Sequence, residues 1–314
     1  MKRLLLPVLL SVSACSAAPQ QDALEQTAAA CTGLSEPAMV WIPGGRFIMG
    51  EQARYPEEGP PRAVEVAGFW MSATEVTNAQ FAKFVAATGY RTEAERRPPQ
   101  LAGAPPEMLQ PGSAVFRVPT PDNGNWWGWV PGANWRHPSG PHSTIAGRDN
   151  DPVVQVSWND ARAYAKWAGL SLPSEEQWEF AARAGAAALP DPKDASGKPT
   201  ANYYQGVFPA RDLGEDGFTG RAPVGCFAAN AFGLHDMIGN VWEWTTSAAR
   251  PGQPVNVIKG GSYLCAANYC ARYRPAARQF QERDLGTDHI GFRVVRISPG
   301  PGAGGELPSD RKRS

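Results

Sequence analysis

Residues 259–278 read Lys-Gly-Gly-Ser-Tyr-Leu-Cys-Ala-Ala-Asn-Tyr-Cys-Ala-Arg-Tyr-Arg-Pro-Ala-Ala-Arg, an irregular stretch with two cysteines. Cys265 and Cys270 stand five residues apart, after Gly260 and Gly261, which permit tight or left-handed backbone. In an extended segment the two cysteine Cα atoms would lie roughly 16 Å apart, whereas a disulfide needs them within about 7 Å. The spacing alone leaves open both a disulfide in a folded-back loop and a thiol pair for redox chemistry or metal binding.

The surroundings of the two thiols suit a metal or redox site. Thiolates are soft ligands that select Cu(I), zinc or iron–sulfur clusters. Two thiolates are too few for a closed structural zinc site, which needs four ligands. Arg272, Arg274 and Arg278 follow the cysteines, and a nearby guanidinium lowers the pKa of a thiol and favours the thiolate. The plainer interpretation of these arginines is pairing with buried acids such as Glu243.

Short motifs around the cysteines are more specific than their spacing. They are Gly-Gly-Ser-Tyr-x-Cys at 260–265, Tyr-Cys at 269–270, Arg-Tyr-Arg at 272–274, Gly-Asn-Val-Trp-Glu-Trp at 239–244 and Gly-Phe-Arg at 291–293. This set resembles the formylglycine-generating enzymes, the sulfatase-modifying factor family, many relatives of which share the Trp-Glu-Trp signature but lack both cysteines. The resemblance covers roughly residues 38–296. It implies one α+β domain of the complex C-type-lectin-like fold, low in regular secondary structure, with a small antiparallel sheet.

The resemblance implies a copper-dependent oxidase, which uses O2 to convert a cysteine of an unfolded sulfatase-type substrate, within Cys-x-Pro-x-Arg or its like, to Cα-formylglycine. Cys265 and Cys270 would hold Cu(I) and would form the catalytic set with Ser262. The implied substrate-binding residues are Glu75, Trp126, Trp242, Arg272 and His289. Plainer interpretations stay open, because a serine can satisfy a turn, clustered tryptophans are mostly core, and a lone histidine is mostly a satisfied polar contact.

Two rival functions also stay open, a non-sulfatase periplasmic maturation factor and a carbohydrate- or peptide-binding lipoprotein on the same fold. Thr287-Asp288-His289-Ile290 stands where many family members have a Ser-x-Asn-type groove, so the client motif is less determined than the chemistry. The cysteine pair discriminates between the functions, because a binding module has no use for an unpaired, Arg-flanked pair of thiols.

The resemblance further implies up to two structural Ca²⁺ sites. The ligands of the first would be Asn202, Tyr203, Asp216 and Phe218, and those of the second Asp236, Met237, Gly239 and Val241. Carboxylate, amide and backbone carbonyl oxygens on loops are the ligands that calcium prefers. An Asp-Gly pair such as Asp216-Gly217 is, taken alone, more often just a turn.

The first residues are typical of an export signal. Lys2 and Arg3 precede a short apolar run at 4–12, and Val-Ser-Ala-Cys at 12–15 resembles a bacterial lipobox. We therefore expect a signal peptide over 1–15, a lipid anchor on Cys15, a tether over 16–37, the catalytic domain over 38–297 and a disordered tail over 298–314. The protein would be a periplasmic or outer-membrane lipoprotein. The alternative is an ordinary signal peptide cut near Ala17 or Ala18.

Export places the domain in an oxidising compartment. With Cys15 acylated and the 265/270 pair kept for chemistry, Cys31 and Cys226 are the candidates for a disulfide. The 30 basic and 30 acidic residues balance, and no basic run occurs outside the last residues, so nucleic acid is not an expected partner. The 33 glycines and 30 prolines favour a loop-rich fold, and we expect a monomer.

Local patterns predict a few regular elements. Two strand-like runs flank a Pro-Gly-Gly turn within residues 39–50, and alternation predicts a strand over 62–71. Helices are predicted from Thr77 or Asn78 to about 88, from a cap at Asn159 or Asp160 to about 168, and from a Ser174 cap to near 185. Residues 93–125 lack periodicity and read as a long surface excursion.

Overall fold

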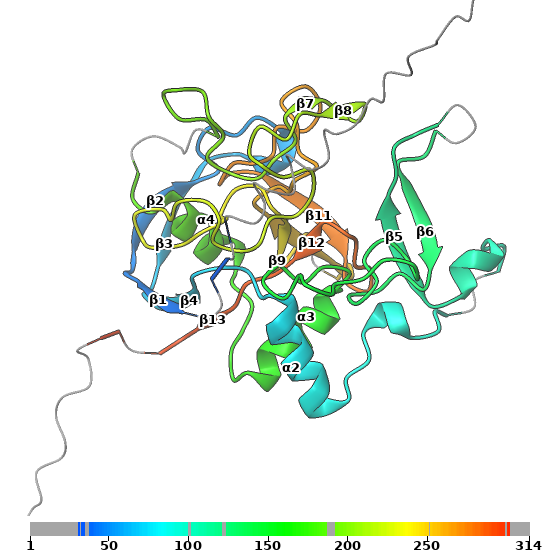
Figure 1. The fold of residues 1–314 in the computed structure, drawn as a ribbon. Coiled ribbons are helices and arrows are strands. Elements are labelled where there is room, and N and C mark those ends of the chain that lie inside the picture. The colour runs from blue at the N-terminus through cyan, green and yellow to red at the C-terminus, as the bar shows by residue number, and fades with distance from the viewer. Residues whose placement is uncertain are drawn as a thin grey trace, which may run out of the picture.

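The computed structural model describes residues 31, 33–34, 38–99, 102–120, 124–186, 192–250, 252–298 and 300–301. The predicted signal peptide, Cys15, most of the tether and nearly all of the tail lie outside the described residues. Short helices and several small sheets are joined by long ordered loops (Figure 1). No helix within the described ranges is long and apolar enough to span a bilayer.

A three-stranded antiparallel sheet brings the two ends of the domain together. Its order is β1 (Met39–Ile42), β4 (Phe69–Ser72), β13 (Val295–Arg296). Beside it, β2 (Gly45–Met49) pairs with β3 (Arg62–Val66). The strand predictions for 39–50 and 62–71 are thus confirmed, except that residues 67–68 separate β3 from β4.

The central sheet has four strands and carries the Trp-Glu-Trp signature. Its order is β11 (Arg278–Glu282), β10 (Val255–Lys259), β9 (Trp242–Ala248), β12 (Ile290–Gly291). The expected antiparallel arrangement holds for β11, β10 and β9, but β12 pairs with β9 in parallel. Trp242, Glu243 and Trp244 are all buried, because the two faces of β9 are covered by different parts of the chain.

Capping boxes start the α-helices of the described residues. They are α2 (Asn78–Thr88), α3 (Trp158–Trp167) and α4 (Glu175–Arg183), with N-caps at Thr77, Ser157 and Ser174. The predicted cap of the second helix is wrong by two or three residues. Ser157 caps α3, and Asp160 is the third helical residue, whose carboxylate accepts a hydrogen bond from the Ser157 N–H at 2.9 Å.

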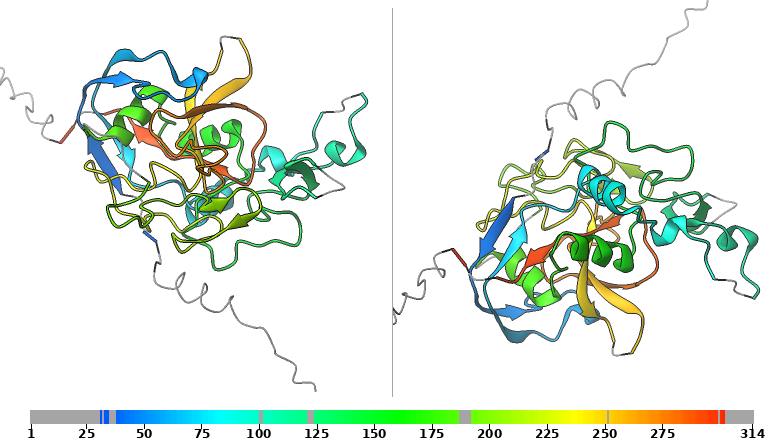
Figure 2. Two further views of the ribbon diagram at one scale, coloured as in Figure 1. Left: turned by 90° about the horizontal axis from the view of Figure 1, so that it is seen from above. Right: turned by 90° about the horizontal axis from the view of Figure 1, so that it is seen from below.

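A hairpin projects from the main body (Figures 1 and 2). It is formed by β5 (Gly112–Phe116) and β6 (Trp127–Pro131), within and just beyond the predicted surface excursion. Short 3₁₀ turns at Glu93–Glu95 and Pro106–Leu109 precede it. The remaining strand pair is β7 (Gly206–Val207) with β8 (Arg211–Asp212).

A disulfide and a hydrogen bond attach Cys31 and Leu34 to the folded domain. Cys31 forms the predicted disulfide with Cys226, with 5.8 Å between their Cα atoms. The Leu34 N–H donates to the Val224 carbonyl at 3.0 Å. Cys31 and Leu34, which the sequence assigned to the tether, are therefore attached to the folded domain.

Candidate functional site

The loop after β10 folds back on itself and brings the two thiols together. Gly260 and Gly261 have φ of +98° and +79°, and a Cβ on Gly261 would lie 2.7 Å from the Arg272 carbonyl oxygen, so only glycine fits there. The Cys265 N–H donates to the Ser262 carbonyl at 2.9 Å, and the Cys270 N–H donates to the Ala266 carbonyl at 3.0 Å. As a result the Cys265 and Cys270 Sγ atoms lie 3.6 Å apart as free thiols.

The two sulfur atoms have different surroundings. The Cys265 Sγ is buried and accepts a hydrogen bond from the Ser262 N–H at 3.4 Å. The Cys270 Sγ accepts a hydrogen bond from the Arg272 Nη1 at 3.5 Å. The hydrogen bond from the Cys265 thiol, together with the Arg272 guanidinium, lowers the pKa of Cys270 to about 6. The same hydrogen bond, with burial, raises the pKa of Cys265. These surroundings therefore favour the thiolate at Cys270 over the thiolate at Cys265.

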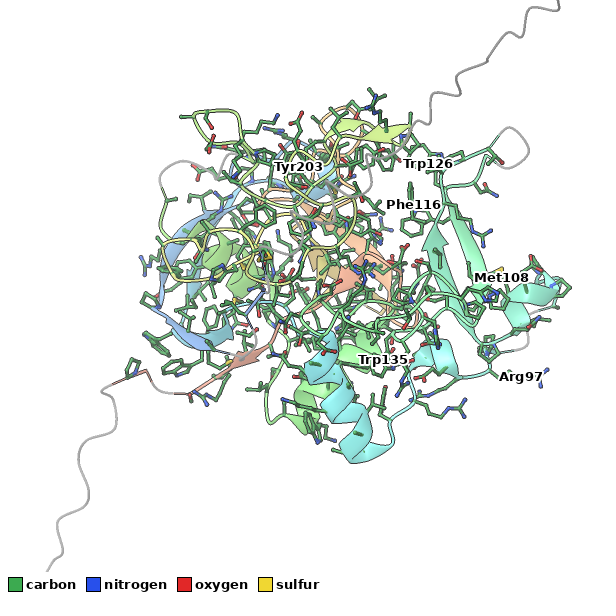
Figure 3. All side chains as sticks on the ribbon, viewed as in Figure 1. Arg97, Met108, Phe116, Trp126, Trp135 and Tyr203 are labelled. Carbon is green, nitrogen blue, oxygen red and sulfur yellow. A yellow bond between two sulfur atoms is a disulfide. The ribbon has the colours of Figure 1, made fainter. Side chains whose placement is uncertain are left out.

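A cavity of about 120 Å³ opens onto the cysteine pair. Aromatic side chains from three segments form its wall: the Trp126 and Tyr269 ring centroids lie 4.5 Å apart, and the Phe208 and Tyr269 rings stack at 5.0 Å. Figure 3 places Phe116 and Trp126 on the side of the hairpin that faces the main body. The lining residues are Phe116, Trp126, Trp127, Phe208, Trp242, Ser262, Leu264, Cys265, Tyr269, Cys270, Arg272, Gln279 and His289.

A larger cavity of about 780 Å³ is lined by residues within 138–151 and 217–223 and by Tyr263, and it shares no lining residue with the first. It contains no cysteine and no histidine. The smaller cavity is therefore the candidate site, because it contains the thiol pair.

Most residues predicted for the site meet at this cavity. Trp126, Trp242, Arg272 and His289 line it with Ser262 and the two cysteines. The Ser262 hydroxyl also accepts a hydrogen bond from the Leu264 N–H at 3.3 Å. Ser262 therefore also satisfies a backbone group of the turn, as the plainer interpretation expected. Sequence reasoning missed Phe208, Phe116 and Gln279, which come from separate loops and strands and stand in no motif.

Glu75 is the exception, and its predicted place in the peptide groove is wrong. Its side chain is 1% exposed and does not line the cavity. Its Oε1 accepts the Asn240 Nδ2 at 3.0 Å, and its Oε2 lies 4.0 Å from Arg293. Burial, and then the charge of Asp236, raises the pKa of Glu75 well above its ordinary value. Asn240, Arg293 and Asp236 surround Glu75 and come from distant parts of the chain, so no local sequence pattern reveals this buried position.

His289 is a neutral wall residue. Its ring packs on Trp127 with 4.7 Å between centroids, and its Nδ1 lies 2.6 Å from the Thr287 Oγ1. Burial lowers the pKa of His289 to about 3, so the imidazole carries no charge near pH 7. It can exchange a hydrogen bond with a bound backbone without placing a charge beside the thiols.

The arginines after the cysteines do pair with acids, but not with Glu243. Arg272 pairs with Glu57, and Arg274 pairs with the buried Glu58. Glu243 instead accepts two hydrogen bonds from Arg293, at 2.7 and 2.8 Å.

At the first predicted calcium site, the Asp216 carboxylate is surrounded by N–H donors. The Asp216 carboxylate accepts the Tyr203 N–H at 3.2 Å, the Phe218 N–H at 2.8 Å and the Gln205 Nε2 at 2.6 Å. The Asn202 Nδ2 donates to the Asn240 Oδ1 at 3.0 Å. Burial raises the pKa of Asp216 to about 6. An ion there would offset this burial cost.

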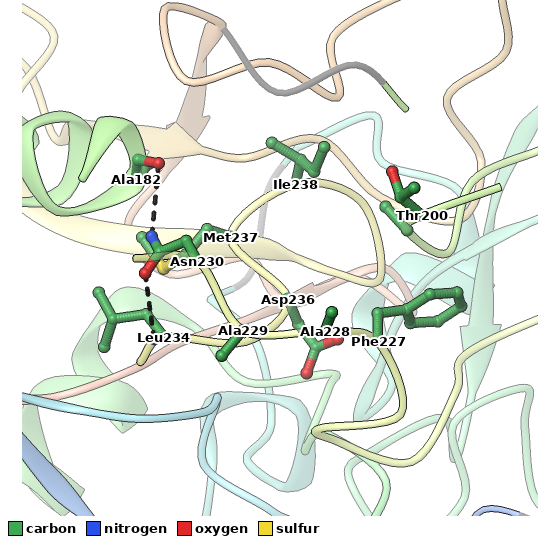
Figure 4. A pocket seen from close by; sticks show the side chains of 11 residues that line it. Ala182, Thr200, Phe227, Ala228, Ala229, Asn230, Leu234, Asp236, Met237 and Ile238 are labelled. Carbon is green, nitrogen blue, oxygen red and sulfur yellow. Dashed lines mark hydrogen bonds between the residues drawn. The ribbon is translucent and has the colours of Figure 1, made fainter. Parts of the chain in front are cut away.

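At the second predicted calcium site, Asp236 lines a cavity of about 200 Å³, which Figure 4 shows from close by. Its Oδ2 accepts the Gly225 N–H at 2.7 Å, and a hydrogen bond between its carboxylate and the Glu75 carboxyl opposes the rise in its pKa that burial causes. A buried carboxylate is a ligand that a hard cation prefers. No group of three or more His, Cys, Asp or Glu side chains suits a metal among the described residues, so a cation here needs amide and carbonyl oxygens.

Comparison with known proteins agrees with this geometry. The family model described as "Sulfatase-modifying factor enzyme 1-like domain" matches residues 24–298. The formylglycine-generating enzyme of Mycobacterium tuberculosis is 47% identical over 289 residues, which cover 82% of this chain and 97% of that protein. The chain belongs to the formylglycine-generating enzyme family.

Two further relatives bear on fold and activity. The solved structure of PvdO from Pseudomonas aeruginosa has a TM-score of 0.59 at 25% identity and covers 83% of this chain and 94% of that one, which confirms the predicted fold class. The mouse protein named inactive C-alpha-formylglycine-generating enzyme 2 is 42% identical, over 85% of this chain and 88% of that protein. Overall sequence identity therefore does not decide whether a member of the family is active. The residues at the site must decide it.

One wall of the family's site in this chain depends on a buried acid. The Asp288 carboxylate accepts the Phe116 N–H of β5 at 3.2–3.3 Å. Burial raises the pKa of Asp288 to about 6, against the opposing charge of Arg221. Between about pH 4 and 6 the folded state thus binds more protons at Asp288 than the unfolded state, so this group lowers stability as pH rises through that window.

We therefore predict that Asp288→Asn removes this part of the pH dependence. Asparagine keeps an acceptor for the Phe116 N–H and cannot ionise. When the pH falls from 7 to 5, the urea concentration at the midpoint of unfolding is expected to rise more for the wild type than for the variant. If the midpoint changes by the same amount between pH 5 and pH 7 in both proteins, the assignment to Asp288 is contradicted.

Proposed function

We propose that the protein is a copper- and O2-dependent oxidase that converts a cysteine of a sulfatase-type substrate, in a Cys-x-Pro-x-Arg-like motif, to Cα-formylglycine. The observation that carries the proposal is the free thiol pair, with Sγ atoms 3.6 Å apart, at the floor of an aromatic cavity. Two soft sulfur donors fit Cu(I), and in the part of the chain that the structure describes no third His, Cys, Asp or Glu side chain completes a metal-binding group with them. Bound there, Cu(I) would supply the one-electron chemistry with O2 that no side chain of the chain provides.

The residues of the chain have definite tasks in this proposal. Cys265 and Cys270 present the two sulfur ligands, and Arg272 balances the negative charge of the Cys270 thiolate. Cys265 is buried, and the rings of Trp126 and Tyr269 provide surface for an unfolded peptide. Ser262 offers a hydroxyl at the cavity floor.

We further propose that Ca²⁺ binds at the two loop sites and rigidifies them. Support comes from the buried carboxylates of Asp216 and Asp236, whose pKa values burial raises. The other proposed ligands are Asn202, Tyr203 and Phe218 at the first site and Met237, Gly239 and Val241 at the second, which would supply amide and backbone carbonyl oxygens.

Export with a lipid anchor on Cys15 also belongs to the proposal, as does a monomeric state. The disulfide between Cys31 and Cys226 supports an oxidising compartment. A periplasmic or outer-membrane location follows from the lipobox-like start of the sequence.

The experiment uses the Cu(I)-loaded protein and a Cys-Thr-Pro-Ser-Arg peptide under air, with mass spectrometry of the peptide. Conversion of thiol to aldehyde is expected for the wild type, and loss of conversion is expected for Cys265→Ala, for the protein kept copper-free by a chelator and without O2. Ala267→Ser, at an exposed position of the same loop, is the matched control and keeps activity. Copper binding without conversion points to another client motif, and absence of copper binding points to the binding-module alternative.

A further inference from the structure

The guanidinium of Arg272 is held on three sides. Its Nη1 lies 3.5 Å from the Cys270 Sγ. Its Nη2 pairs with the Glu57 carboxylate. Its Cζ lies 4.1 Å from the centroid of the Tyr55 ring. Glu57 and Tyr55 come from a loop more than two hundred residues earlier in the chain, so this arrangement appears only in the folded protein.

The loop that carries Tyr55 and Glu57 is itself anchored to buried groups. A 3₁₀ turn spans Pro56–Glu58. The buried Glu58 accepts the Arg54 N–H at 2.7 Å and pairs with Arg274. The Arg278 Nη1 donates to the Glu57 carbonyl at 3.2 Å. The support for Arg272 is therefore built into the domain rather than supplied by a free surface loop.

An arginine side chain needs such support to stay beside a sulfur atom. Holding it in one rotamer costs side-chain entropy, and one contact to sulfur at 3.5 Å does not offset that cost. The carboxylate and the ring face supply the remaining contacts. Glu57 is also negatively charged, so it cannot favour the Cys270 thiolate by its own field. Its effect on the site is geometric and acts through Arg272.

We propose that Tyr55 and Glu57 are positioning residues of the cysteine site: they hold the Arg272 guanidinium against Cys270, and this contact sets the affinity of the thiol pair for Cu(I). The inference rests on the proposed function. Neither residue lines the cavity, so each is proposed to act on the cysteine pair through Arg272.

The test measures Cu(I) affinity by competition with a chromophoric chelator. Residues that orient a metal ligand from outside typically change affinity 10–100-fold when replaced, so Tyr55→Leu and Glu57→Ala are each expected to weaken Cu(I) binding about tenfold or more. Tyr55→Phe keeps the ring and is expected to match the wild type. Glu65→Ala, which removes an exposed ion pair with Arg46, is the matched control and keeps full affinity.

The outcomes separate this inference from the proposed function. If the wild type binds Cu(I) and Tyr55→Leu and Glu57→Ala bind it equally well, the positioning role is refuted while the copper site stands. If Tyr55→Phe loses as much affinity as Tyr55→Leu, the ring face is not what holds Arg272, and the role of Tyr55 is refuted. If the wild type binds no Cu(I), the proposed function fails and the inference with it. Unfolding midpoints of all variants show that the affinities refer to folded protein.

Discussion

Replacing Arg293 with methionine is expected to lower the free energy of unfolding by about 3–5 kcal/mol, the range for removing one partner of a buried ion pair. Arg293 and Glu243 are both fully buried, and they are joined by two hydrogen bonds of 2.7 and 2.8 Å. Arg293 also donates to the His235 carbonyl at 2.9 Å and lies 4.0 Å from the Glu75 carboxylate. Without it, buried carboxylates lose their positive counter-charge.

The loss is large against the whole stability of a domain, which is typically about 5–15 kcal/mol. It is measured by urea unfolding followed by tryptophan fluorescence. Arg46→Met is the matched control, because Arg46 and Glu65 form a pair with 81% and 69% exposed side chains, and such pairs contribute about 0–1 kcal/mol. Arg293→Lys keeps the charge but loses the guanidinium that makes two hydrogen bonds to Glu243. Its unfolding midpoint is expected to lie between those of the wild type and Arg293→Met. Equal midpoints for Arg293→Met and Arg46→Met would refute the prediction.

Breaking the Cys31–Cys226 disulfide is expected to cost about 2–5 kcal/mol. The bond joins residues 195 apart in sequence, and closing a long loop restricts the unfolded chain strongly. Urea midpoints of Cys31→Ser and Cys226→Ser, measured without reductant, are expected to fall together to one lower value.

The reductant supplies the control for this prediction. Adding it to the wild type is expected to bring the midpoint down to that of the variants, whereas the variants do not respond. A wild type whose midpoint is insensitive to reductant would show that the disulfide contributes no stability.

Sequence reasoning predicted what depends on neighbouring residues. The Ser174 cap was predicted because a capping box is complete within four residues, and Thr77 was one of the two caps predicted for α2. The Ser157 cap was missed because Asp160, its partner in the box, is itself an acceptable cap residue. The meeting of Cys265 and Cys270 was predicted from the resemblance, since spacing alone left a disulfide equally open.

The tertiary structure decided what depends on residues far apart in the chain. Glu75 was assigned to the groove and instead lies buried near Arg293, and Arg272 and Arg274 found their partners in Glu57 and Glu58. No local pattern marks these pairs, because a buried charge takes whatever counter-charge the packing brings within reach. The sequence by itself determined the family, the thiol pair and the candidate disulfide. Only the fold determined which acids and rings surround them, because those contacts form when loops hundreds of residues apart pack together.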